Sequence, residues 1–314
     1  MIIDQKKAKK ILLEGGNVII PTETVYGLAG SINCPNSIET IYRLKNRPKQ
    51  NPLIIHFANL KQVLECVEDV PESFYRLAKF FWPGPLTMVL QGRNNLNHAI
   101  TAGLKTVAVR IPAHLETLKL IEETGPLVAP SANISGRPSS TKIKHIENDF
   151  GKNFPILEGT EPICGLESTI IGWIDNKWVF LRHGVISLQE IERFLGENIN
   201  HSDLQICPGT KFRHYSPEAK IFYSNEMFFK ADAIVGYENR SYLSKKPFYS
   251  LGRDDDPKKI AYRLFDLFRR FDEDCLKNVW IDIKLPNEGL YITIIERILK
   301  ASYTDSSNFE SNVL

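Results

Sequence analysis

Apolar residues recur along the first two hundred positions with two different periods. Apolar positions three or four residues apart predict helices, and this pattern covers residues 4–15, 37–45, 59–67, 72–82, 142–150 and 187–195. Short runs rich in Val and Ile predict buried strands, and these are residues 17–21, 51–57, 86–91, 107–112, 126–128, 154–157, 170–173 and 178–181. The alternation predicts an α/β domain with an open sheet.

A second alternation begins after a stretch that has no period. Residues 197–217 contain Pro208-Gly209 and end at Pro217, which is typical of a long linker. Beyond them, predicted strands at 221–223, 233–237, 248–251 and 279–283 alternate with predicted helices at 257–271 and 289–301. We therefore expect a first domain over residues 1–198, a linker over 199–218 and a smaller Rossmann-like α/β domain over 219–314.

Composition and charge narrow the class of protein. The 314 residues are 43% hydrophobic and 24% charged, which suits an ordinary globular chain long enough for two domains. The formal net charge is only +2, so an anion site must be local rather than a basic face. The five cysteines form no Cys-x-x-Cys pair, and no apolar run approaches the roughly eighteen residues of a membrane helix. We expect reduced thiols, no structural metal site, no membrane span and a cytoplasmic location.

Polar segments follow several of the predicted strands. The longest, at residues 129–141, reads APSANISGRPSST, and similar segments lie at 21–30, 167–169 and 182–184. Ligands of open α/β sheets bind beyond the carboxyl ends of the strands. A single segment of this composition is more often a surface loop. The repetition at several strand ends favours a binding rim.

The same strand and helix ends carry an unusual set of cations and donors. Arg110 follows three apolar residues in a strand, so either a protein carboxylate or a substrate carboxylate must meet it. The other cations are Lys45, Arg47 and Arg182, and the nearby hydroxyl and amide groups are those of Thr22, Ser131, Asn133, Ser139 and Ser168. Such groups suit a polyanionic ligand with small polar parts, for which a nucleotide is the natural candidate. The motifs of Walker ATPases, classical dinucleotide enzymes, zincins and serine hydrolases are missing from the sequence.

Eight short motifs, in order, resemble the YrdC-type threonylcarbamoyl-AMP synthase family over roughly residues 5–200. They are PTETVYGL at 21–28, KNRP at 45–48, NPLIIH at 51–56, WPGPLT at 82–87, VRIP at 109–112, APSAN at 129–133, EST at 167–169 and LR at 181–182. The segment 214–217 and the α/β tail resemble the longer, two-domain branch of the family. One departure is His183, where the family usually has proline.

The resemblance implies a YrdC-type twisted open sheet with a ligand cleft and a nucleotidyltransferase activity. The expected enzyme combines L-threonine, bicarbonate and ATP, with Mg²⁺, into threonylcarbamoyl-AMP and pyrophosphate. A separate, downstream tRNA threonylcarbamoyl transferase would consume the adenylate. Positioned cations, together with Mg²⁺, would supply most of the catalysis, because charge builds on the phosphate oxygens and the leaving group.

The resemblance also implies roles for individual residues. Lys45 and Arg47 would face the phosphates as catalytic groups, and Thr106, Ser131, Asn133, Ser139 and Arg182 would hold the nucleotide. Thr22, His56, Arg110 and Ser168 would surround threonine and its carbamate. A further hypothesis is that residues 197–217 fold back over the cleft as a lid. This lid would contain Lys211, Arg213 and His214 and would place Tyr215 against the nucleotide. The alternative for this segment is a disordered tether.

Two other classes of function stay open from the sequence. A double-stranded RNA-binding module is one, although the near-neutral charge argues against RNA binding as more than a weak, secondary property. A nucleotide-binding regulatory protein without turnover is the other.

Overall fold

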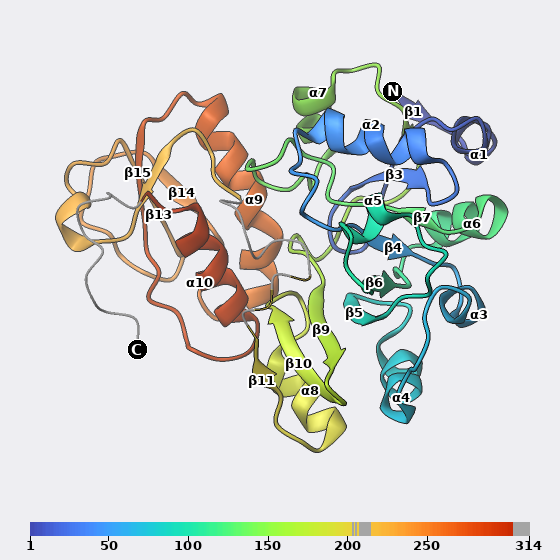
Figure 1. Ribbon diagram of the computed structural model, residues 1–314. Coiled ribbons are helices and arrows are strands. Elements are labelled where there is room, and N and C mark those ends of the chain that lie inside the picture. Colours follow the sequence, from blue (N-terminus) through green and yellow to red (C-terminus); the bar gives the residue numbers. More distant parts are fainter. Residues whose placement is uncertain (203, 205, 207–214, 304–314) are drawn as a thin grey trace.

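The computed structural model describes residues 1–202, 204, 206 and 215–303. It contains two α/β domains that lie side by side (Figure 1). An open, mixed sheet of eleven strands forms the first domain, and a parallel sheet of four strands forms the second.

The strands of the large sheet lie in the order β1-β8-β2-β3-β7-β4-β6-β5-β9-β10-β11. Their bounds are Ile2–Ile3 (β1), Val18–Ile20 (β2), Gly27–Ser31 (β3), Ile54–His56 (β4), Leu86–Gln91 (β5), Thr106–Arg110 (β6), Leu127–Val128 (β7), Ile156–Leu157 (β8), Thr169–Ile174 (β9), Lys177–Arg182 (β10) and Asn200–His201 (β11). Strands β4 and β6 are parallel neighbours, and their register places His56 opposite Arg110. Two predicted site residues thus meet at one end of the sheet.

Eight helices accompany this sheet among the described residues. They are Gln5–Leu13 (α1), Pro35–Lys45 (α2), Leu60–Leu64 (α3), Glu72–Phe81 (α4), His98–Thr101 (α5), Leu115–Thr124 (α6), Ile143–Phe150 (α7) and Leu188–Leu195 (α8). Local chemistry sets their starts: the Asp4 side chain accepts a hydrogen bond from Lys7 N–H at the start of α1, and Ser187 accepts one from Glu190 N–H at the start of α8.

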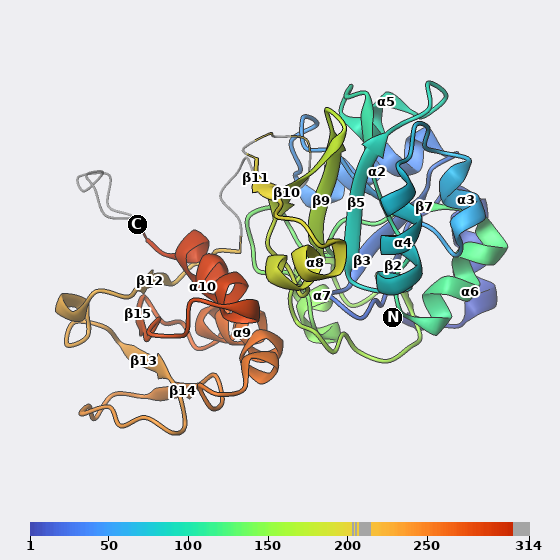
Figure 2. The same ribbon diagram turned by 90° about the horizontal axis from the view of Figure 1, so that it is seen from below.

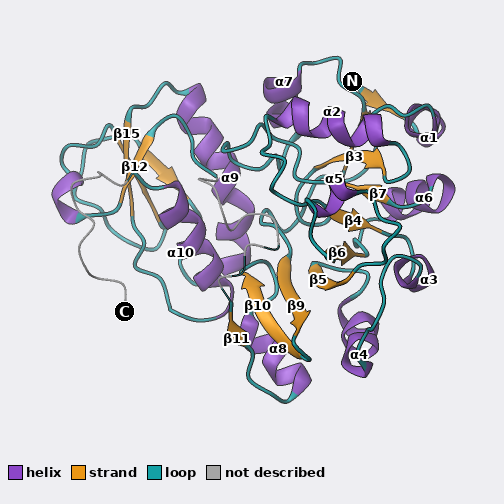
Figure 3. Cartoon of the chain, viewed as in Figure 1, coloured by secondary structure: helices purple, strands orange, loops and turns teal. Residues whose placement is uncertain are grey.

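The second sheet has the order β12-β15-β13-β14. Its strands are Lys220–Phe222 (β12), Ala233–Gly236 (β13), Phe248–Ser250 (β14) and Asn278–Ile281 (β15), and its helices are Pro257–Glu273 (α9), Gly289–Ala301 (α10) and the short 3₁₀ turn Asn225–Met227. Helices α9 and α10 lie between this sheet and the first domain (Figures 2 and 3). Their apolar faces, including Phe265, Phe268 and Ile298, form the core of the second domain.

Helix α9 holds a long loop of the first domain in place. Arg269 is buried and donates from Nη2 to the carbonyl oxygen of Pro138 at 2.6 Å and to Oδ2 of Asp149 at 2.7 Å. Lys142, at the start of α7, donates to Asp266 of α9 at 2.7 Å. Residues 134–142, which include the second half of the predicted binding rim, are therefore positioned by the second domain as well as by the first.

Several sequence-based expectations about elements were wrong. Residues 21–30 were expected to be a polar segment after a strand, but residues 27–31 form β3, which pairs with β2 and β7. Helices α5 and α6 were not predicted. Strand β11 lies in the expected linker, yet it pairs with β10, so the first sheet extends past residue 198. Of the proposed lid, Lys211, Arg213 and His214 lie outside the described residues.

Candidate active site

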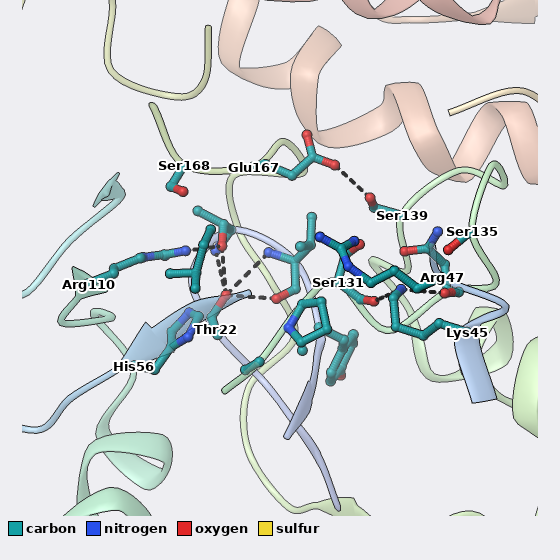
Figure 4. A pocket seen from close by; sticks show the side chains of 18 of the residues that line it. Thr22, Lys45, Arg47, His56, Arg110, Ser131, Ser135, Ser139, Glu167 and Ser168 are labelled. Atoms are coloured by element: carbon teal, nitrogen blue, oxygen red, sulfur yellow. Dashed lines mark hydrogen bonds between the residues drawn. The ribbon is translucent and has the colours of Figure 1, made fainter. Parts of the chain in front are cut away.

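A polar cavity of about 760 Å³, its mouth included, opens at the end of the large sheet beside the second domain (Figure 4). Eleven of the twelve predicted site residues line it: Thr22, Lys45, Arg47, His56, Arg110, Ser131, Asn133, Ser139, Ser168, Arg182 and Tyr215. Thr106 does not line the cavity, because it begins β6 whereas Arg110 ends the same strand.

Lys45 and Arg47 lie where helix α2 ends. Asn46 adopts a left-handed conformation (φ 50°) there, which reverses the chain between the two cations. The ammonium of Lys45 is buried and donates to the carbonyl oxygens of Ser131 and Asn133, each at 2.5 Å. Arg47 donates to the carbonyl oxygens of Asn51 at 3.0 Å and Pro52 at 2.7 Å.

Backbone carbonyls, rather than carboxylates, thus hold both cations, and no ion pair to either of them occurs among the described residues. Burial, and then the neighbouring charge of Arg47, hold the pKa of Lys45 well below its ordinary value. Burial likewise lowers the pKa of Arg47 to about 10. An anionic ligand would relieve this unbalanced positive charge, because an opposite charge favours the ionised form of each group.

The loop after β7 supplies hydroxyl and amide groups. Asn133 donates to the carbonyl oxygens of Ile134 at 2.8 Å and Arg137 at 2.9 Å, which fixes the turn. Its buried Oδ1 accepts no hydrogen bond from any described residue, so it is available to a ligand. Ser139 donates to Oε1 of Glu167 at 2.6 Å (Figure 4).

Arg110 meets a protein carboxylate at the other end of the cavity. Its Nη2 lies 2.7 Å from Oε1 of Glu23, and both side chains are buried. The N–H does not point at that oxygen, so this ion pair contains no hydrogen bond. Nη1 donates to Oγ1 of Thr24 at 3.1 Å, and Thr24 in turn lies 2.7 Å from Oγ1 of Thr22. Of the two alternatives left open for Arg110, a protein carboxylate is present, while the guanidinium still faces the cavity and keeps donor capacity.

His56 adds a neutral imidazole beside this pair. Burial, and then the charge of Arg110, lower the pKa of His56 to about 3. Its Nδ1 has no hydrogen-bond partner among the described residues. The ring can therefore exchange a hydrogen bond with a ligand without becoming charged near neutral pH.

Ser168 and Arg182 come from the β9–β10 hairpin. Arg182 donates from Nη2 to the Ser168 carbonyl oxygen at 2.8 Å and to its Oγ at 3.2 Å. The chain after Arg182 passes so close to residues 168–169 that a Cβ at Gly184 would overlap the backbone of Ser168 and Thr169. A glycine is needed there for this approach. The carbonyl of His183 accepts a hydrogen bond from Arg297 at 2.6 Å.

Sequence reasoning missed some residues of the cavity. The lining also contains Thr24, Tyr26, Ser135, Arg137 and Glu167, and Glu23 lies directly behind Arg110. Glu23 follows the predicted site residue Thr22 and Glu167 precedes Ser168, each within a motif that is otherwise uncharged. A carboxylate in such a buried segment implies a buried cation partner, which is a signal that could have found both.

Comparison with known proteins agrees with this two-part architecture. The Sua5/YciO/YrdC family model, described as telomere recombination, matches residues 10–184. A second model, described as the threonylcarbamoyl-AMP synthase C-terminal domain, matches residues 186–302. The fold and the cavity thus define a two-domain α/β protein of the Sua5 type.

Individual relatives identify the family more narrowly. Threonylcarbamoyl-AMP synthase of Pyrococcus abyssi is 39% identical over 94% of this chain and 93% of its own length. The enzyme of the same name from Bacillus subtilis is 35% identical over 94% and 92%. The crystal structure of P. abyssi Sua5 complexed with L-threonine superposes with a TM-score of 0.87 at 36% identity, covering 96% of this chain and 97% of that one. The chain belongs to the threonylcarbamoyl-AMP synthase family, which confirms the resemblance, fold class and enzyme function predicted from the sequence.

Two further features of the described residues bear on partners. None of their helices combines the length and apolar character needed to cross a membrane. They also contain no group of three or more His, Cys, Asp or Glu side chains that could hold a metal ion.

Proposed function

We propose that this cavity converts L-threonine, bicarbonate and ATP into threonylcarbamoyl-AMP and pyrophosphate, for later transfer to tRNA by a separate enzyme. One observation carries the proposal. Buried cations held by backbone carbonyls lie at one end of the cavity, and an arginine, a neutral histidine and threonine hydroxyls lie at the other. A polyanion and a small polar amino acid would fit these two ends side by side.

The nucleotide is assigned to the end with Lys45 and Arg47. These two cations would contact the phosphates, with Ser131, Asn133, Ser139 and Arg182 holding the rest of the nucleotide and Tyr215 covering it. Support comes from the buried, uncompensated charges and from the unpartnered Oδ1 of Asn133. Thr106 is left out of the assignment, since the cavity does not include it.

The amino acid is assigned to the end with Arg110. The guanidinium would grip the threonine carboxylate, and Thr22, His56 and Ser168 would surround the side-chain hydroxyl and the carbamate. Glu23 balances the arginine charge before the substrate enters. The pairing offsets the cost of burying this cation. An unpaired buried arginine would destabilise the fold.

The reaction requires no covalent bond between the protein and a substrate. The threonine amine and bicarbonate give a carbamate with loss of water, and a carbamate oxygen then attacks the α-phosphorus of ATP as pyrophosphate leaves. Negative charge grows on the phosphate oxygens during this step, and Lys45 and Arg47 would stabilise it in a site with little water. Their prior fixation by carbonyl oxygens means that little reorganisation is needed.

Mg²⁺ fits this cavity only as a companion of ATP. Glu167 is the one carboxylate among the described residues that line the cavity, and its oxygens already contact Ser139 and Arg297. The triphosphate would therefore have to supply most of the ligands of the ion, as is common for Mg²⁺. No step above depends on a metal held by the protein.

The test is adenylate formation from a panel of amino acids with ATP and bicarbonate, detected by mass spectrometry. Threonine should be used at least about tenfold better than valine, because a site built to bond a hydroxyl penalises the isostere that lacks it. The Lys45→Met variant should lose about 100-fold or more of kcat. Lys49→Met is the matched control, since Lys49 is exposed and pairs with Glu39, and it should keep normal turnover. Equal use of valine, or full activity of Lys45→Met, contradicts the assignment.

RNA binding remains a separate prediction from the sequence. Its signature would be an affinity that falls steeply with salt and does not depend on threonine.

A further inference from the structure

Arg297, in the second domain, contacts a residue that lines the active-site cavity. It lies on α10 and its side chain is completely buried. The guanidinium donates from Nε to Oε2 of Glu167 at 3.1 Å and from Nη2 to the carbonyl oxygen of His183 at 2.6 Å. Both acceptors belong to the first domain, and Glu167 lines the cavity.

Glu167 poses an electrostatic problem for an anion site. It is a buried carboxylate, and among the described residues that line the cavity no other side chain can carry a negative carboxylate charge, whereas several are cations. Burial by itself would raise its pKa, but the charges of Arg297 and Arg182 and the hydrogen bond from Ser139 hold that pKa below its ordinary value. The carboxylate is therefore ionised near neutral pH, and an ionised carboxylate repels phosphate groups in a low-dielectric site.

The two oxygens of Glu167 face in different directions. Oε1 accepts from Ser139, a predicted nucleotide contact, and Oε2 accepts from Arg297. Figure 4 shows Glu167 between Ser139 and the pale red helices of the second domain. Arg297 thus balances the negative charge from outside the cavity, while Ser139 is held in place from within it.

Arg297 also fixes Tyr215. Its guanidinium carbon lies 4.7 Å from the centre of the Tyr215 ring, which stacks on Phe265 of α9 at 5.2 Å. Tyr215 has a left-handed backbone (φ 67°), which is unusual for an aromatic residue and persists only where surrounding contacts enforce it. The second domain supplies two of these contacts, through α9 and α10.

We propose that Arg297 is a positioning residue for nucleotide binding: it neutralises the Glu167 carboxylate and holds Tyr215 at the cavity, so the second domain completes the ATP site. The inference rests on the proposed function, because it concerns the nucleotide of that reaction. It gives the second domain a specific task beyond stabilising the first.

The test compares the affinities of the wild type and of Arg297 variants for an ATP analogue that has a methylene bridge between the α- and β-phosphates. Calorimetry measures the binding directly. Arg297→Met should weaken binding about tenfold or more, while the KM for threonine changes much less than the KM for ATP. The decisive variant is Arg297→Met with Glu167→Gln. Because the unpaired negative charge is removed, the double variant should bind the analogue at least about threefold more tightly than Arg297→Met does. A purely structural role of Arg297 predicts no recovery.

Glu273→Gln is the matched control. Glu273 pairs with Lys144 across the same domain interface at 2.7 Å but does not line the cavity, so its variant should bind the analogue normally. Should Arg297→Met not fold, as judged by circular dichroism, Arg297→Gln with and without Glu167→Gln makes the same comparison, because glutamine also removes the positive charge.

Each remaining outcome is informative. A double variant that binds the analogue no better than Arg297→Met overturns the charge-balancing role, and normal binding by Arg297→Met overturns the whole inference. A wild-type chain that binds the analogue and forms no adenylate overturns the proposed function, while the comparison of affinities still decides the inference. A wild-type chain that binds no analogue overturns both.

Discussion

The imidazole of His56 offers a pH signature at the scale of one residue. Its pKa is lowered from 6.5 to about 3, first by burial and then by Arg110. Between these two values the unfolded chain binds a proton that the folded chain does not, so the free energy of unfolding falls as pH falls. Each pH unit in this window removes up to about 1.4 kcal/mol.

The variant His56→Gln should lack this loss. Between about pH 7.5 and about pH 4, urea unfolding should show that the wild type loses roughly 2 to 4 kcal/mol more stability than His56→Gln. The control is His98→Gln, which replaces an exposed histidine and should follow the wild-type curve. Parallel curves for wild type and His56→Gln would mean that this imidazole is not buried in its neutral form.

Single residues also show which contacts could be predicted from the sequence. Arg110 in an apolar strand required an anionic partner, and that physical requirement was sound. The identity of the partner could not be predicted from the sequence. Glu23 is distant from Arg110 along the chain and contacts it only once the segment after β2 is folded beside the end of β6. The same holds for Glu167, whose partner Arg297 lies in the other domain.

The β9–β10 hairpin positions two site residues through one close contact. Gly184 follows Arg182, and a Cβ there would overlap backbone atoms of Ser168 and Thr169, which cannot move aside as a flexible side chain could. Gly184→Ala should therefore cost roughly 1 to 3 kcal/mol of stability. It should also weaken ATP binding, because separating the two segments displaces Arg182 from Ser168.

Gly196→Ala separates these two effects. Gly196 ends α8 with φ 79° and has open space around its Cβ position, so alanine there costs about 1 kcal/mol through backbone strain alone. ATP affinity, measured by calorimetry, should stay normal in this variant. Equal ATP affinities for the two alanine variants would show that the close contact does not position Arg182.

Elements with a strong period were predictable, and those defined by pairing were not. Residues 86–91 and 289–301 were predicted with the bounds that the structure has, because their apolar pattern and flanking breakers decide the conformation locally. Strand β3 contains two glycines, Gly27 and Gly30, and its conformation comes from hydrogen bonds to β2 and β7. Helix α6 was missed although its pattern is helical, with Thr117, Leu120 and Ile121 buried on one face.

At the scale of the molecule, the two domains share buried charges rather than only apolar surface. Arg269 of α9 contacts Asp149, whose side chain is fully buried in the first domain, and Arg297 of α10 contacts Glu167. The contacts end on the loop at 134–142 and on the β9–β10 hairpin, which both line the cavity. This arrangement could not be predicted from the sequence, because each pair joins residues more than a hundred positions apart.

Arg269 and Arg270 allow a matched test of this coupling. Arg269→Met would leave Asp149 with Arg137, whose side chain is 37% exposed, as its remaining charged partner among the described residues. We expect a loss of about 3 kcal/mol, since removing one partner of a buried ion pair is far costlier than losing a surface pair. Arg270 is exposed and pairs with Asp274, so Arg270→Met should change stability by less than about 0.5 kcal/mol.

Differential scanning calorimetry should show where the loss occurs. The wild type is expected to unfold in one transition, because the buried contacts of α9 and α10 make each domain depend on the other. Arg269→Met should broaden this transition or split it in two, and it should weaken ATP binding, because Arg269 also holds the carbonyl of Pro138 beside the predicted nucleotide contact Ser139. If Arg269→Met unfolds at the temperature of Arg270→Met, with a single sharp transition, the domains are held together by apolar packing and the charge pairs at their interface are dispensable for cooperativity.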